Sequence, residues 1–349
     1  MSEFETCPNE ELIADNLASF SGDLFTASDI KRFLEIATYD KPNSIRFVAW
    51  LAALRIIDTE RIKQMPDIVR AMTYYDRCIH RYYKTDYHEP LRNLINGPDI
   101  RVAVESNLEW FKNIALFEGL TESIIEDAAV RLMRILAVLS LDNSKYKFTK
   151  SDERIVMICY VIALCFARRG TLTNYFAEAF AFHMSNAILS SLNLQREIIR
   201  MNADQDYSDD FQKYFRRFTG DSPQKCKEAG VNPMKIYDEM IWTMFTNTHD
   251  NGDCLLLIFD LIILHLREYR HYTNYLVAAH FKWYAEHGGR LETDKIIPDV
   301  PFDANNLVIS VDIMKEYREV DYVETFLNSM CPCFQGFNIL FGNRKVKKD

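Results

Sequence analysis

Three aspartates and a lysine lie close together in the middle of the chain, in the segment Asp206-Tyr-Ser-Asp209-Asp210-Phe-Gln-Lys213. Aspartates at this spacing on helices can hold magnesium against a diphosphate substrate, because carboxylate oxygens are the ligands that this hard cation prefers. Lys213 stands where that chemistry needs another carboxylate, and its ammonium group would repel the cation. We therefore interpret the run as a solvated loop rather than as a metal site.

The histidines and cysteines show no metal-binding spacing. Eight histidines are present, but there is no His-Glu-x-x-His pair and no Cys-x-x-Cys motif to join them in a zinc site. The sequence also lacks the glycine-rich loops Gly-x-Gly-x-x-Gly and Gly-x-x-x-x-Gly-Lys-Ser/Thr, which cradle phosphates. We expect neither a metal nor a cofactor.

The C-terminal segment 330–349 combines two thiols with a basic cluster. Cys331 and Cys333 precede several aromatic residues, and the cations gather in 344–348. Acylated cysteines beside a polybasic segment would attach the chain to a membrane surface through two signals. A frayed C-terminus is the alternative interpretation.

Composition indicates that helices position these groups. Among 349 residues, 11 are glycine and 10 are proline, well below the roughly 7% and 5% of average chains. This scarcity disfavours β-sandwiches and propellers, whose tight turns need residues with positive φ. The formal charge of −9 argues against a surface built for nucleic acid, which requires clustered cations.

Other features of the sequence indicate a cytoplasmic protein. Several of the eight cysteines lie inside apolar runs, which is typical of buried free thiols in a reducing compartment. The N-terminus is acidic and has no signal-peptide pattern. The longest apolar runs, 155–167 and 254–264, fall short of the roughly 18 to 20 residues of a membrane span.

Apolar residues recur at three- and four-residue steps along most of the chain, which predicts an all-α fold. Residues 152–169 are apolar nearly all round and predict a central, enclosed helix, with Gly170 in the left-handed position that ends it. Residues 203–227 are polar and predict a loop or seam between two halves, and residues 294–306 predict a connector. The other expected helices are 122–141, 174–191, 234–246, 252–267, 272–287 and 308–328.

Several short motifs follow one another in a meaningful order. The run Ile45-Arg46-Phe47-Val48-Ala49-Trp50 resembles the Arg-x-x-x-Trp opening of TBC domains, the helical modules of Rab GTPase-activating proteins. Leu94-Ile95-Asn96-Gly97-Pro98-Asp99-Ile100-Arg101 resembles that family's Ile-x-x-Asp-x-x-Arg box. Further on, Met133-Arg134-Ile135-Leu136 with Asn143, then Ile241-Trp242, and then Leu257-Ile258-Phe259-Asp260 are similar to later family motifs. The resemblance covers about residues 25 to 300.

The resemblance implies a regulator of a Rab-type small GTPase. Proteins of this family bind the GTP form and supply two side chains in trans, an arginine that offsets charge developing on the γ-phosphate and a glutamine that orients the attacking water. Phosphoryl transfer depends mainly on positioning and charge, and an arginine finger contributes roughly 10³ to 10⁵ in rate.

The arginine box can be aligned in two registers. Anchoring on Ile95 places Arg101 in the finger position and Pro98 in the aspartate position, whereas anchoring on Asp99 places Val102 in the finger position. We favour Arg101, which would lie in the first turns of a helix begun by Gly97 and Pro98. The alternative is a surface arginine that pairs with Glu105 four residues later.

At the glutamine box, Phe148-Thr149-Lys150-Ser151 stands against the family's Tyr-x-Gln-Gly. Lys150 thus replaces the glutamine. An ammonium group attracts phosphate, but it cannot both donate to and accept from a water as an amide does. Weak or lost catalysis follows if the match holds, and a solvated loop residue before a helix capped by Ser151 is the alternative.

The remaining matched residues suggest architecture or GTPase contact. Arg46 and Trp50 are four apart on one predicted helix and can pack together. Asp260 lies within an apolar helix, where a carboxylate needs a cap or an arginine partner. Trp242 suggests packing.

Taken together, these observations predict a TBC-like all-α domain of two halves in vesicle traffic. We expect an N-terminal extension over 1–24, the domain over 25–300 with halves of about 25–200 and 228–300, a helix over 301–329, and a Cys/basic tail over 330–349. The expected partner is a Rab-type GTPase in its GTP form, with peripheral contact to endomembranes through the tail. A non-catalytic Rab-binding scaffold is the main alternative, and a helical enzyme of the isoprenoid-synthase type is a remote one.

Overall fold

The computed structural model describes residues 26–36, 41–59, 61–82, 96–142, 152–201, 206–249 and 252–330, together with the single positions Ile13, Asp15, Leu91 and Leu94. In these residues the chain is helical nearly throughout, as the apolar spacing predicts. The one sheet among them is a hairpin of two short antiparallel strands, β1 (Gly289–Leu291) and β2 (Ile296–Pro298), of which only β2 lies within the expected connector. The predicted all-α class is confirmed.

The N-terminal group of helices surrounds a buried central helix, α8 (Asp152–Arg169). Apolar residues on every face of α8 are buried, because α8 packs against α3, α5, α7 and α9. The prediction of a central, enclosed helix is therefore confirmed. The other helices of this group are α2 (Ala27–Glu35), α3 (Asn43–Ala53), α4 (Arg61–Tyr82), α5 (Gly97–Phe117), α6 (Glu122–Ile125), α7 (Ala128–Asp142) and α9 (Asn174–Met201).

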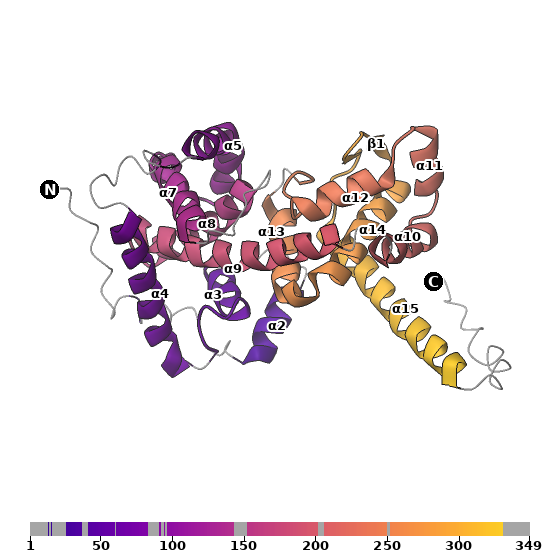
Figure 1. Cartoon of the computed structure of the whole chain (residues 1–349), viewed down its shortest axis with the longest axis horizontal. Helices are drawn as coiled ribbons and strands as arrows, with labels where there is room; N and C mark the ends of the chain where they lie inside the picture. Colours follow the sequence, from indigo (N-terminus) through magenta and orange to yellow (C-terminus); the bar gives the residue numbers. More distant parts are fainter. Residues whose placement is uncertain are drawn as a thin grey trace.

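The C-terminal group is arranged around α14 (Tyr269–His287), which contacts α10, α11, α12, α15 and β2. In Figure 1, α9 runs from the N-terminal group towards this second group, and α15 projects away from the body of the molecule. The elements of the second group are α10 (Asp206–Phe218), α11 (Ser222–Glu228), α12 (Pro233–Trp242), α13 (Gly252–Leu264), the 3₁₀ turn η1 (Leu266–Glu268), and α15 (Ala304–Met330).

The prediction of a loop over residues 203–227 is wrong, because α10 and α11 cover most of this segment. Phe211, Tyr214 and Phe215 form a buried face at three- and four-residue spacing, although the rest of the segment is polar. The ring of Phe211 stacks on that of Tyr237 with centroids 4.5 Å apart, and Phe215 meets Phe281 edge-on at 4.8 Å. Three aromatic residues are enough to bury α10 against α14, which the average polarity of the segment conceals.

The ends of α3 and α8 are followed by left-handed residues other than glycine. Gly170 does not take the left-handed position after α8, contrary to expectation; Thr171 takes it, with φ of 53°. Arg55, with φ of 60°, does the same after α3. In a chain with so few glycines, these helix ends are closed by residues whose Cβ makes the left-handed conformation costly. By contrast α14 ends before Gly288, at φ of 79°, as predicted.

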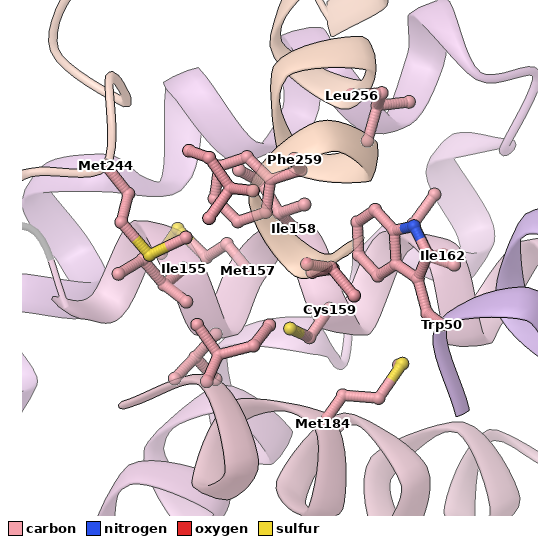
Figure 2. Packing of buried hydrophobic residues seen from close by; sticks show 14 of the residues in the cluster. Trp50, Ile155, Met157, Ile158, Cys159, Ile162, Met184, Met244, Leu256 and Phe259 are labelled. Atoms are coloured by element: carbon pink, nitrogen blue, oxygen red, sulfur yellow. The ribbon is translucent and has the colours of Figure 1, made fainter. Parts of the chain in front are cut away.

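A single apolar core joins the two groups of helices. Figure 2 shows Leu256 and Phe259 of α13 beside Trp50 of α3 and side chains of α8. The rings of Trp50 and Phe259 stack with centroids 6.0 Å apart, and both are fully buried. Helix α13 also packs against α2, so the C-terminal group is anchored deep in the N-terminal one.

Every helix among the described residues falls short of the combined length and apolarity that a membrane span needs.

Candidate functional site

The first turn of α5 carries the candidate finger. Helix α5 begins at Gly97 with Pro98 in its first turn, as the sequence predicts. A Cβ atom at Gly97 would lie 2.7 Å from the carbonyl oxygen of Leu91, so glycine is required there by close backbone approach. The helix start is thus fixed by packing, which places Arg101 one turn into α5.

Arg101 lies on the solvent-facing side of α5. Ile100 and Val104 on either side of it are buried, whereas Asp99, Arg101 and Val102 are exposed. Val102, the finger position in the second register, leaves 63% of its surface exposed. Both registers therefore place an accessible side chain here, and the catalytic role of Arg101 stays a prediction.

The second finger box cannot be placed. Phe148, Lys150 and Ser151 lie outside the described residues, which resume with Asp152 at the start of α8. The side chain of Asp152 is fully buried. The direction of Lys150 relative to Arg101 stays untested.

The beginning of α8 is tied to α5 by a polar cluster that lies outside the sequence motifs described above. The amide of Asn107 on α5 donates to Oε1 of Glu153 at 3.0 Å, and its carbonyl oxygen accepts from Nε of Arg154 at 2.7 Å. Because a helix rises about 1.5 Å per residue, Asn107 lies about 9 Å along the axis from Arg101. The first turn of α8 is therefore fixed to α5 less than two helical turns from the position of Arg101. The sequence signal for this cluster is Asn107 itself, because a polar residue on the apolar face of α5 needs a hydrogen-bonding partner.

Arg154 extends this cluster to a third element. Its Nη1 donates to the carbonyl oxygen of Thr246 at 2.9 Å and to Oδ1 of Asn247 at 2.8 Å. Its guanidinium carbon lies 4.9 Å from the centre of the Trp110 ring of α5, at cation–π distance. One arginine thus holds α5, α8 and the segment after α12 together.

The segment 243–249, between α12 and α13, has an unusual backbone. The expected helix over 234–246 ends early, at Trp242, because Met244 and Phe245 both adopt left-handed conformations with φ of 49° and 63°. Both side chains are fully buried. Figure 2 shows Met244 beside Ile155 of α8. Two consecutive left-handed residues without glycine are costly, and here tight packing maintains them.

A pair of buried histidines follows this segment. Nε2 of His249 lies 2.8 Å from Nε2 of His280 on α14, and Nδ1 of His280 lies 2.6 Å from the carbonyl oxygen of Leu276. Neutral His280 therefore donates from Nδ1 and accepts at Nε2 from His249. Burial lowers the pKa of His280 to about 4, and burial together with the neighbouring His280 lowers the pKa of His249 well below its ordinary value.

Arg46, Trp50 and Asp260 form one buried network. Nε of Arg46 lies 3.1 Å from Oδ1 of Asp260, which also accepts the Trp50 indole N–H at 2.7 Å, while Nζ of Lys41 lies 3.0 Å from Oδ2. The expected arginine partner of Asp260 is thus Arg46. Burial lowers the pKa of Lys41, and the nearby carboxylate of Asp260 opposes that shift. With all these side chains enclosed, the network joins α3 to α13 and offers no access to a partner.

The remaining predicted residues occupy separate places. Trp242 is the half-buried last residue of α12. Cys331 and Cys333 lie outside the described residues. Within the described ranges, no group of three or more histidine, cysteine, aspartate or glutamate side chains is arranged to hold a metal ion.

No protein-family model matches the sequence, and no curated protein matches it. Four solved chains match in structure. One of them is the crystal structure of the Ypt/Rab-GAP domain of Gyp1p, with a TM-score of 0.53 and 10% sequence identity. The match covers 88% of this chain and 99% of that domain. At this identity the comparison establishes a shared fold: the chain has the all-α architecture of a Ypt/Rab-GAP domain.

Proposed function

We propose that this protein regulates a Rab-type small GTPase by binding its GTP form and stimulating GTP hydrolysis in vesicle traffic. The observation that supports the proposal best is the fold match, which extends over nearly the whole Ypt/Rab-GAP domain of Gyp1p. The exposed side chain of Arg101, on a helix start that packing fixes, supports it further.

In this proposal, α5 carries Arg101 towards the γ-phosphate of the bound GTPase. A guanidinium there would offset the negative charge that develops as the phosphoryl group transfers, a contribution worth roughly 10³ to 10⁵ in rate. Its planar donors suit phosphate oxygens. The partly buried links from Asn107 to Glu153 and Arg154 would keep α5 fixed against α8 while the partner binds.

A second candidate is a scaffold that binds the GTPase without turnover. It is favoured by Lys150, which stands where the resemblance calls for the water-orienting glutamine. A lysine donates only and cannot accept from the attacking water. In that case the protein would hold the GTP form and leave the hydrolysis rate unchanged.

The two candidates separate in one assay. We would measure single-turnover GTP hydrolysis by a panel of purified Rab-type GTPases with the full chain, and binding to the same GTPases loaded with a non-hydrolysable analogue or with GDP. Arg101→Ala should abolish stimulation and leave binding in place, while the control Lys112→Ala, an exposed position on the same helix, should change neither. Binding without stimulation would establish the scaffold, and binding to none of the panel would contradict both candidates.

A further inference from the structure

Helix α10 lies in the segment 203–227, which the sequence predicts to be a loop. A basic hollow lies between α10 and α15. It is lined by Gln212, Lys213, Arg216 and Arg217 of α10 and by Tyr317 of α15; we call it the α10 basic groove. The three cationic side chains are all exposed. In a chain of formal charge −9, a cluster of three cations in one hollow is a local reversal of sign.

Two of the three cations of the groove lie over one aromatic ring, that of Tyr317. The guanidinium carbon of Arg217 lies 4.0 Å from the centre of the Tyr317 ring, and Nζ of Lys213 lies 5.7 Å from it. Phe218 meets the same ring edge-on at 5.4 Å. A cation stacked on an aromatic face still directs N–H groups outward, and holding it there reduces the entropy lost when it binds an anion.

The helix that carries the groove is also packed firmly against the body of the molecule. On the opposite face of α10, Phe211 and Phe215 are buried against the aromatic residues of α12 and α14. The basic side chains therefore project from a helix that is packed in place.

The position of the groove favours a flat anionic partner. In Figure 1, α10 and α15 lie at the end of the molecule opposite to α4, α5 and α7, and α15 leads away from the body. The sequence that continues from α15 holds a second group of cations in 344–348. A basic hollow at one end of the molecule can bind an extended negative surface, and each cation near such a membrane contributes about fivefold in partition.

We propose that the α10 basic groove is a docking surface for an anionic lipid membrane, with the phosphates of the headgroups bound by Lys213, Arg216 and Arg217. Docking at this end leaves α5 and Arg101 away from the lipid. The inference does not depend on the proposed GTPase function, because it follows from charge and position alone.

Vesicle sedimentation with the full chain tests this proposal. We expect binding to phosphatidylcholine vesicles that contain phosphatidylserine, and none to phosphatidylcholine alone. The triple substitution Lys213→Gln, Arg216→Gln and Arg217→Gln should weaken partition by about 100-fold. The control Lys31→Gln, Lys112→Gln and Arg290→Gln removes the same charge from exposed positions on α2, α5 and β1, and it should retain most of the binding.

Two further variants distinguish loss of charge from misfolding, and binding by the groove from binding by the cations of 344–348. The charge-preserving set Lys213→Arg, Arg216→Lys and Arg217→Lys should bind like the parent. Replacing the cations of 344–348 by serine should leave measurable binding that the groove substitutions then abolish. The proposal is overturned if the Gln variant binds like the parent, if the control loses as much, or if duplex DNA binds more tightly than the vesicles.

Discussion

The indole N–H of Trp50 donates to the Asp260 carboxylate at 2.7 Å across a separation of 210 residues. The same carboxylate pairs with Arg46 and Lys41, and each of these four side chains is buried. Two motifs that lie far apart in the sequence are thus the two sides of one contact between α3 and α13. The presence of both motifs therefore has a structural meaning in this chain: the contact fastens the C-terminal group of helices to the N-terminal one.

Removing the acid should destabilise the fold strongly. In Asp260→Ala, Arg46 and Lys41 remain buried without their counter-charge, a change that costs about 3–5 kcal/mol. Urea unfolding should show this decrease in the free energy of unfolding. The control Asp312→Ala removes an acid that is 61% exposed and should cost less than about 1 kcal/mol. Equal effects of the two substitutions would contradict the role of the network.

The helix end after α8 offers a stabilising substitution. Thr171 is β-branched and holds φ of 53°, so Thr171→Gly should raise the free energy of unfolding by about 1 kcal/mol. Gly119→Ala is the reverse case, because φ is 78° and no atom lies within 4 Å of the added Cβ; it should destabilise by a similar amount. Chemical denaturation measures both, and a destabilised Thr171→Gly would show that the threonine side chain makes a compensating contact.

The sequence predicts several of the buried helices, but no expected helix covers α2 or α4, and helix ends are predicted less well. Period-3.6 patterns identify α7, α8, α9 and α14 because their buried faces are wide. The same criterion fails for α10, where Phe211, Tyr214 and Phe215 are the buried residues of a charged segment. It also fails at Met244 and Phe245, whose left-handed backbone has no local signal: Met244 lies beside Ile155 of α8, and the Phe245 ring stacks on His280 of α14.

The candidate site is predicted only in part for a similar reason. Gly97 and Pro98 are local signals, and they place the start of α5 correctly. Arg154 has no such signal, because its partners Asn107 and Thr246 come from two other elements. Long-range hydrogen bonds of this kind depend on tertiary packing, which spacing within one segment cannot reveal.

Arg154 should control the coupling between α5, α8 and segment 243–249. Arg154→Met keeps an apolar stem near Trp110 but leaves the carbonyl oxygen of Thr246 and the side chain of Asn107 without a donor, at a cost of about 1–3 kcal/mol. Amide hydrogen exchange should accelerate in segment 243–249 and in α5. The control Arg168→Met, at an exposed position near the end of α8, should leave both protected. Unchanged exchange in Arg154→Met would show that the clamp is dispensable.

Acid should weaken the fold through the histidine pair. Burial lowers the pKa of His280 from 6.5 to about 4, so below pH 6.5 the unfolded chain binds a proton that the folded pair excludes. The free energy of unfolding should therefore fall as the pH drops from about 6.5 to 4, by at most about 1.4 kcal/mol per pH unit for each such group. His280→Gln should flatten this slope, and His271→Gln, at an exposed position, should not. A slope that is identical in the two variants would contradict the assignment.

Restoring the amide at the second finger position tests whether α5 and the start of α8 act together. If Arg101 reaches the γ-phosphate while Lys150 fails to orient the water, Lys150→Gln should raise stimulated GTP hydrolysis by at least tenfold without tightening binding, because an oriented water matters only in the transition state. The double variant Arg101→Ala with Lys150→Gln should lose most of that gain, since both side chains would act on one phosphoryl group. Lys112→Gln is the matched control on α5. A gain that persists without Arg101 would place the arginine outside the reaction, and the exposed first turn of α5 would then serve binding alone.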